Sequence, residues 1–189
     1  MSKLPEYLKY KANGESYTNM QVKGEKYRFT LLTPFLVRAE WSEDGNFEDR
    51  ATAIAVNRKL DEFDFEIEKK DSFLFIKTKG IILKYSENSV FSADTLSITL
   101  RENNFKWKYG TKISNLGGTA STLDGKCESS EIGKGVCSQD GIALIEDESL
   151  AFDSDGWLAD RIEGNIDIYI FAYGHKYIQA VRDFYRLTG

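Results

Sequence analysis

The stretch that decides the fold reads SFLFIKTKGIILKY over residues 72–85. Two apolar runs of strand length, 72–77 and 80–85, lie on either side of the dipeptide Thr78-Lys79. Runs this short and this apolar are typical of buried strands, and so short a link between them is typical of a hairpin. We therefore predict a β-hairpin that lies in the core.

Other segments carry strand patterns. Residues 63–68 and 96–100 alternate apolar and polar side chains with period two, which is typical of half-buried strands. Further strands are predicted at 27–31 and 36–41, separated by a turn at Thr33-Pro34, and at 142–145 and 166–171. Turn dipeptides stand at Asn13-Gly14, Asp44-Gly45, Asp140-Gly141 and Asp155-Gly156. Many short strands at close spacing predict a mainly β protein, an antiparallel β-sandwich, and not alternating β/α units.

One helix is predicted near the C-terminus, from about Lys176 to Leu187. Its apolar residues recur every three or four positions, the helical period: Tyr177, Ile178, Val181, Phe184 and Tyr185. The polar face is expected to carry Arg182, Asp183 and Arg186, and Gly189 stands at a helix stop. A stripe this rich in aromatic residues indicates a surface that packs against something else.

Composition excludes several functional classes. The net charge is −5, with acids and bases interspersed, so we expect neither nucleic acid nor an anionic membrane as a partner. The start of the chain has no apolar core, which argues against a signal peptide and for a cytoplasmic protein. Cys127 and Cys137 are expected to be reduced thiols, although a disulfide between them stays open. We expect no cofactor and no metal, since His175 is the one histidine.

A glycine-rich, hydroxyl-rich and acidic segment covers residues 115–141. It contains NLGGT at 115–119, TLDG at 122–125 and SQDG at 138–141, none of which suits a helix or a core strand. Loops on a rigid scaffold concentrate binding groups, so Asp140 and Asp124 are candidate binding residues. The alternative is that each forms a turn before its glycine. Gly117 and Gly118 are expected to allow close backbone approach.

Other motifs give no catalytic centre. The chain has no Gly-x-Ser-x-Gly elbow and no phosphate loop, and Asp153 to Gly156 is a turn and not a calcium loop. Trp107 and Trp157 could stack on a sugar ring or belong to the core. The acidic run from Glu40 to Asp49 is expected to be a solvated turn.

Read in order, several segments resemble one known domain. They are LTPFLVRAEWS at 32–42, GNFEDR at 45–50, FSADTLSI at 91–98, the glycine-rich segment, SQDGIALIED at 138–147, FAYGH at 171–175 and FYRLTG at 184–189. Together these segments, spread over residues 27–189, resemble the N-terminal β-sandwich domain of family 31 glycoside hydrolases, the α-glucosidase and α-xylosidase family.

The resemblance implies a galactose-mutarotase-like supersandwich over residues 1–174 and a helix at 175–189 that leads towards a (β/α)₈ barrel. In the family, the barrel supplies the aspartate nucleophile and the acid/base, so we expect no catalytic residue in this chain and no activity from it alone. A loop of the domain reaches the substrate entrance there. Asp140, Asp124 and Gln139 would then contact an α-linked glucoside or xyloside, with Gly117 and Gly118 shaping the loop.

One position departs from the family pattern. Gln139 stands where members often carry an arginine before the aspartate, which puts a salt-bridging role at this position in doubt. The alternative function is a stand-alone carbohydrate-binding or protein-interaction module.

Overall fold

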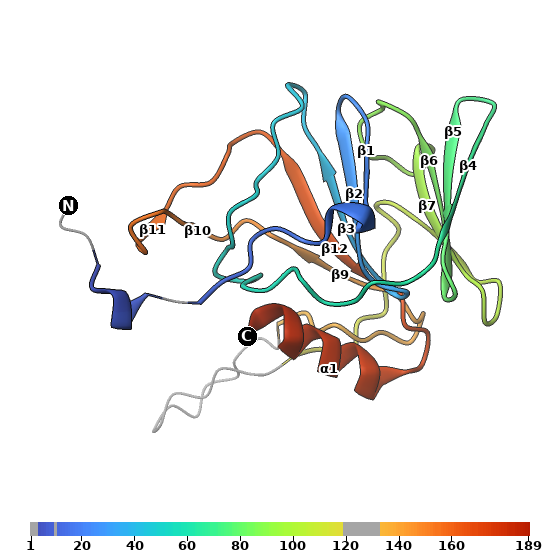
Figure 1. Ribbon diagram of the computed structural model, residues 1–189. Helices are drawn as coiled ribbons and strands as arrows, with labels where there is room; N and C mark the ends of the chain where they lie inside the picture. The colour runs from blue at the N-terminus through green and yellow to red at the C-terminus, as the bar shows by residue number, and fades with distance from the viewer. Residues whose placement is uncertain (1–3, 10, 119–132) are drawn as a thin grey trace.

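The computed structural model describes residues 4–9, 11–118 and 133–189 (Figure 1). These residues form antiparallel sheets and one α-helix near the C-terminus. The predicted fold class, a mainly β antiparallel sandwich with a C-terminal helix, is confirmed. Within the described part of the chain, no helix combines the length and apolarity that crossing a bilayer requires.

The first sheet has five strands in the order β1-β2-β3-β12-β9. Their bounds are Gln21–Lys23 (β1), Tyr27–Thr33 (β2), Leu36–Trp41 (β3), Ile166–Phe171 (β12) and Ala143–Glu146 (β9). All four pairings are antiparallel, and β12 comes from far along the chain to lie between β3 and β9. Pro34 and Phe35 form the turn that joins β2 to β3, one residue later than predicted.

The second sheet is a meander in which five consecutive strands pair in chain order. Their bounds are Glu66–Lys70 (β4), Phe73–Lys77 (β5), Ile81–Ser86 (β6), Leu96–Leu100 (β7) and Lys106–Lys108 (β8). The predicted hairpin is confirmed as β5–β6. Its turn is fixed by the Thr78 hydroxyl, which accepts hydrogen bonds from the Gly80 and Ile81 N–H groups, both at 3.1 Å.

Short elements complete the described chain. A two-stranded ribbon joins Ala151–Phe152 (β10) to Leu158–Ala159 (β11), and single 3₁₀ turns lie at Glu6–Leu8 (η1) and Thr18–Met20 (η2). The one α-helix, α1, spans Tyr177–Thr188, within a residue of the predicted bounds.

The main core lies between the two sheets and is rich in aromatic rings. Phe29 of β2 and Tyr85 of β6 are both fully buried, and their ring centroids are 5.1 Å apart in an edge-to-face arrangement. Tyr27 lies 4.9 Å from the same Tyr85 ring. Such edge-to-face pairs add to the free energy gained by burial. These contacts join β2 to β6, so the two sheets form the layers of a sandwich.

A second core covers part of the outer face of the first sheet. Leu36 of β3 and Phe171 of β12 point away from the main core and pack with Ala180 and Leu187 of α1. Burying one side of a helix against a sheet face is the usual way to satisfy both apolar surfaces. The helix is therefore held by the sheet strands that also build the sandwich.

The strand predicted at residues 63–68 is only partly correct. The strand there, β4, begins at Glu66, and all five of its residues are exposed, including Ile67 at 51%. Phe63 and Phe65 precede the strand and pack on the main core from an irregular segment. Because β4 is an edge strand that covers no core, its alternation is not the result of a buried face.

Candidate functional site

Part of the glycine-rich segment forms a paired extension, which we call the arm: residues 113–118 and 133–139. Backbone hydrogen bonds join its two sides, from the Leu116 N–H to Cys137 at 3.0 Å and from the Gln139 N–H to Ser114 at 2.9 Å. The Asn115 side chain braces the pair, since it donates to the Gly135 carbonyl at 2.8 Å and accepts from the Gly117 and Gly135 N–H groups. These hydrogen bonds fix the two sides of the arm against each other.

Gly117 and Gly118 lie where the two sides of the arm approach most closely. Gly117 has a positive φ of 84°, a conformation that glycine adopts without strain. A Cβ at Gly135 would stand 2.3 Å from the Gly117 carbonyl oxygen. The Gly118 N–H donates to the Gly133 carbonyl at 2.6 Å. These contacts hold the two sides of the arm close together at Gly117 and Gly118.

Asp140 closes the base of the arm. Its Oδ2 accepts a hydrogen bond from the Ser114 N–H at 2.6 Å, which joins the turn at 138–141 to the other side of the arm. Gln139 next to it is exposed, and its backbone carbonyl lies 3.1 Å from the His175 Nε2. Asp140 and its sequence neighbour Gln139 thus both lie at the base of the arm. Asp124 and Cys127 lie outside the described residues.

The arm and the start of α1 meet at the same place in the fold. The Gly174 N–H donates to the Gly141 carbonyl at 2.9 Å, and the Cys137 Sγ lies 3.8 Å from the carbonyl of Tyr177. Gly141 has a positive φ of 79°, and a Cβ on it would stand 2.7 Å from the Gly174 Cα. This close backbone packing fixes the direction in which the arm leaves the sandwich.

The helix α1 presents three faces. Ala180, Asp183 and Leu187 are buried against the sheet, so the prediction that Asp183 belongs to a solvated polar face is wrong. Asp183 can be buried because its carboxylate keeps a partner there. It accepts a hydrogen bond from the buried Tyr173 hydroxyl at 2.7 Å. Burial raises the pKa of Tyr173 well above its ordinary range, so the phenol stays a donor.

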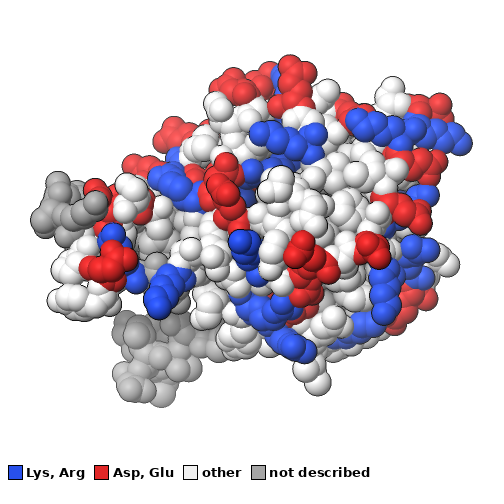
Figure 2. Space-filling model, in the orientation of Figure 1, with Lys and Arg blue, Asp and Glu red and all other residues white. Residues whose placement is uncertain are grey.

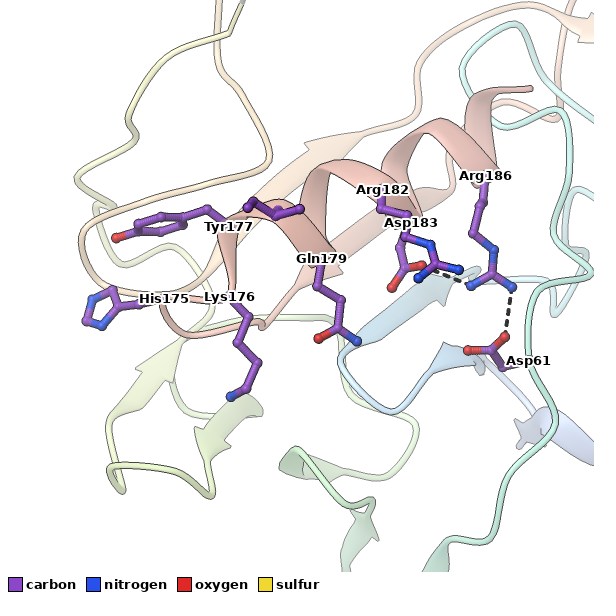
Figure 3. Close-up of a pocket in the computed structure, with 9 residues that line it drawn as sticks. Asp61, His175, Lys176, Tyr177, Gln179, Arg182, Asp183 and Arg186 are labelled. Carbon is purple, nitrogen blue, oxygen red and sulfur yellow. Dashed lines mark hydrogen bonds and ion pairs between the residues drawn. The ribbon is translucent and has the colours of Figure 1, made fainter.

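The polar face of α1 borders a shallow groove of about 840 Å³ (Figure 3). Arg186 connects its two sides, with bonds of 2.9 Å to Asp183 and 2.7 Å to Asp61. Gln179 and Arg182 extend over the groove without a hydrogen bond or ion pair to any described residue. The groove is open and mixed in charge, in keeping with Figure 2, where both signs are interspersed over the visible face.

The third face of α1 is apolar and exposed. Ile178 is 87% exposed, Tyr185 66% and Val181 39%. These residues are three or four positions apart and so share one side of the helix. The sandwich thus covers only part of the apolar surface that the sequence gives this helix, and we call the exposed part the α1 stripe.

The acidic run from Glu40 to Asp49 is a solvated turn only in part, since Glu43, Asp44 and Asp49 are exposed but Glu40 and Glu48 are not. Glu40 and Glu48 are each only 2% exposed, on the outer face of the first sheet. Arg28 donates to both Glu40 carboxylate oxygens, at 2.6 and 2.9 Å, and Arg38 lies 3.0 Å from Glu40. Burial raises the pKa of Glu40, although the two arginines oppose this. Arg38 is on the same strand as Glu40, and Arg28 is directly opposite Glu40 on the neighbouring strand β2. The run of acids alone did not reveal this pairing, because it depends on the register of β2 against β3.

A second set of buried charges continues this network. Arg58 donates to the Tyr169 hydroxyl at 2.7 Å, and its Nη2 lies 3.6 Å from Asp147. Arg161 pairs with Asp147 at 3.3 Å and with Asp167 at 2.5 Å. Each of these carboxylates has a cation beside it, so the network is balanced and structural. It offers no uncompensated charge for chemistry.

The remaining predicted sites have structural roles where they are described. Asp153 accepts hydrogen bonds from the Asp155 and Trp157 N–H groups, both at 2.9 Å, which confirms a turn. In residues 4–9, 11–118 and 133–189, no group of three metal-ligating side chains comes together. Trp107 is 2% exposed and belongs to the main core, so it presents no open stacking surface, while Trp157 is 41% exposed.

Comparison of the chain with protein-family models and with curated proteins found no match. The functional assignment therefore depends on the residues and on the geometry described above.

Proposed function

We propose that this chain is the non-catalytic N-terminal β-sandwich domain of a retaining α-glycosidase of the family 31 type. In this proposal the domain supports a catalytic (β/α)₈ barrel through α1 and lends the arm to the substrate entrance. The barrel supplies the two carboxylates that double displacement at a glycosidic bond requires. The parent enzyme acts on an α-linked glucoside or xyloside.

The observation that carries this proposal is the α1 stripe next to the arm. An apolar helix face that remains exposed marks a protein contact, since contiguous apolar patches on a soluble domain are usually interaction sites. The hydrogen bonds between the 139–141 turn and residues 174–175 place the arm and the stripe on adjoining elements. A partner that packs on the stripe would therefore lie within reach of the arm.

The arm would then border the sugar and not perform chemistry. Asp140 uses one carboxylate oxygen on the Ser114 N–H, and its Oδ1 has no hydrogen bond with any described residue. A carboxylate oxygen positioned in this way accepts hydrogen bonds from sugar hydroxyls well, because charge-assisted hydrogen bonds are the stronger kind. Gln139 beside it supplies an exposed amide.

The test compares this chain with the product of its full reading frame on an aryl α-glucoside. We expect the reading frame to continue beyond Gly189 into β/α alternation and the full product to hydrolyse the substrate. The 189-residue chain alone should not hydrolyse the substrate. In the full product, Ile178→Glu should lower turnover or solubility, whereas Val90→Glu, at a residue that is 50% exposed elsewhere, should not. Turnover by the chain alone, or a stop codon after Gly189, would refute the proposal.

A second candidate, a protein-interaction module, uses the same α1 stripe to contact another copy of the chain. Light scattering separates the two candidates. Concentration-dependent dimers that Ile178→Glu abolishes favour self-association, and a monomer at all concentrations favours the barrel.

A further inference from the structure

The outer face of the second sheet carries a small pocket of about 150 Å³ over strands β6, β7 and β8. The register places Ser97 of β7 between two lysines, because Lys84 lies opposite it on β6 and Lys108 lies opposite it on β8. Lys106 is two residues before Lys108 and so projects from the same face. These side chains alternate with core residues of the same strands and therefore point away from the main core. The pocket shares no residue with the arm or the α1 stripe.

One hydroxyl in this pocket is nearly buried and lacks a partner. Ser97 is 7% exposed, and its side chain forms no hydrogen bond with any described residue. The Oγ itself keeps contact with solvent, so a ligand in the pocket can reach it. Thr95 beside it differs, since its hydroxyl donates to the Val90 carbonyl at 2.7 Å. A polar group that is nearly buried without a partner costs free energy, which a ligand oxygen at Ser97 would recover.

Three ammonium groups border the pocket, and none of them has a carboxylate partner among the described residues. The Lys84 Nζ lies over the Phe73 ring, 3.7 Å from its centroid, and 5.7 Å from the centroid of the Phe75 ring. These contacts hold the ammonium group over the sheet and leave its charge in place. Lys106 and Lys108 are exposed and form no ion pair with a described residue. The pocket thus gathers cations that are free to bind an anion.

Two other lysines of the same sheet already have carboxylate partners. Lys77 donates to Glu68 at 2.6 Å, and Lys69 donates to Glu87 at 2.8 Å. Among the described residues that line the pocket, Asp94 is the one carboxylate, and it is exposed and outside ion-pair distance of all three lysines. The pocket therefore has an excess of positive charge, although the net charge of the chain is −5.

We propose that this pocket binds a phosphate dianion, either free or as the terminal group of a small monoester. Its volume is below the roughly 300 Å³ at which sites for whole organic ligands begin, so it suits one compact group. A phosphate monoester carries a charge of about −1.5 to −2 at pH 7 and three acceptor oxygens. The three lysines and the Ser97 hydroxyl supply matching donors. A metal ion would be repelled by the lysines, and a neutral molecule would leave their charge uncompensated.

The experiment titrates the full 189-residue chain with inorganic phosphate and, separately, with phenyl phosphate. Two-dimensional NMR follows the assigned backbone amide signals, and sodium chloride keeps the ionic strength constant, because salt screens exposed charges. We expect the Ser97 and Lys108 signals to shift saturably, with half-saturation below about 10 mM. Equal affinity for the two probes indicates recognition of the free ion, and tighter binding of phenyl phosphate indicates a monoester.

Matched variants separate a specific site from general attraction of anions. Lys108→Gln should weaken phosphate binding about tenfold, as expected for loss of a charge-assisted hydrogen bond. Lys77→Gln removes the same charge from the same face but does not alter the pocket, so it should bind like the parent. Ser97→Ala should weaken binding about fivefold and leave the urea midpoint unchanged, because the hydroxyl has no partner among the described residues.

The variant Asp94→Asn tests the sign of the ligand's charge. It removes the carboxylate from the pocket, so it should tighten phosphate binding. The proposal is overturned if neither probe gives a saturable shift up to about 50 mM, if Lys77→Gln weakens binding as much as Lys108→Gln does, or if Asp94→Asn weakens it. Ile178→Glu should bind phosphate like the parent, so this result and that of the barrel test are separate.

Discussion

Arg38 donates two hydrogen bonds to Asp167, from Nε to Oδ1 at 2.9 Å and from Nη2 to Oδ2 at 2.6 Å, between side chains that are almost fully buried. Removing one partner of such a pair leaves a buried charge uncompensated. We expect Arg38→Met to lower the free energy of unfolding by about 3–5 kcal/mol, measured by urea titration.

The double variant Arg38→Met/Asp167→Leu should lose less than the sum of the two single variants, since no orphan charge remains. Lys77→Met, which breaks the exposed Lys77–Glu68 pair, is the control and should have no measurable effect. Strict additivity of the two buried substitutions would show that Arg38 and Asp167 do not depend on each other.

Alkaline pH should destabilise the fold through Tyr169. Burial raises the pKa of this phenol to about 12, although Arg38 and Arg58 oppose the rise. The unfolded phenol ionises near pH 10, so between about pH 10 and 12 only the unfolded state loses the proton and stability falls as pH rises. In Tyr169→Phe the decline between pH 9 and 11 should be shallower, by up to about 1.4 kcal/mol per pH unit. Equal slopes would contradict the assignment.

Two glycines with the same backbone conformation should respond differently to alanine. Gly141 and Gly110 both have φ of 79°, but a Cβ at Gly141 meets Gly174 backbone while one at Gly110 meets nothing within 4 Å. Gly110→Ala should cost about 1–2 kcal/mol for the left-handed conformation alone. Gly141→Ala should cost at least about 1 kcal/mol more, because backbone must move. Thermal unfolding of the two variants gives the comparison.

The two sides of α1 should differ in their effect on stability. Leu187 is fully buried, so Leu187→Ala should cost about 2–5 kcal/mol of unfolding free energy. Ile178→Ala, on the α1 stripe, should change it by no more than about 0.5 kcal/mol. A large loss at Ile178 in denaturant titrations would mean that the stripe is already covered within the chain.

The hydrogen bond from Ser114 to Asp140 should control local opening of the arm. Asp140→Ala removes the acceptor, and we expect the Ser114 amide to exchange with solvent about fivefold faster, as a loss of about 1 kcal/mol implies. Asp140→Asn keeps an acceptor oxygen and should stay near the parent rate. An unchanged exchange rate in the alanine variant would show that Asp140 does not control local opening of the arm.

Most strands could be predicted because they have a side in the main core. The hairpin of β5 and β6 and the strands around Leu36 and Ile168 follow their apolar patterns, since burial between two sheets imposes those patterns. The edge strand β4 covers no core, so its limits were missed. The helix position was predicted from its period, but which side the sheet covers depends on long-range packing that the pattern does not encode.

The candidate site was only partly accessible from sequence. The glycines and Asp140 were found because turn chemistry is local. The buried network was missed because Arg28, Arg38 and Asp167 have the same alternating strand positions as solvent-facing residues, and only the covering connections remove them from water. The pocket on the outer face of the second sheet joins residues of β6, β7 and β8 through their register and has no local signal at all.

The strands in the middle of the first sheet are buried on both faces with opposite chemistry. Along β3, Val37 and Ala39 belong to the aromatic core, while Arg38 and Glu40 lie among the charges. A shift of β3 by a single residue against its neighbours would place guanidinium and carboxylate groups among the rings and leave their partners alone. This error is so unfavourable that mispaired sheets should not persist, and the chain has one alignment of its central strands to find during folding.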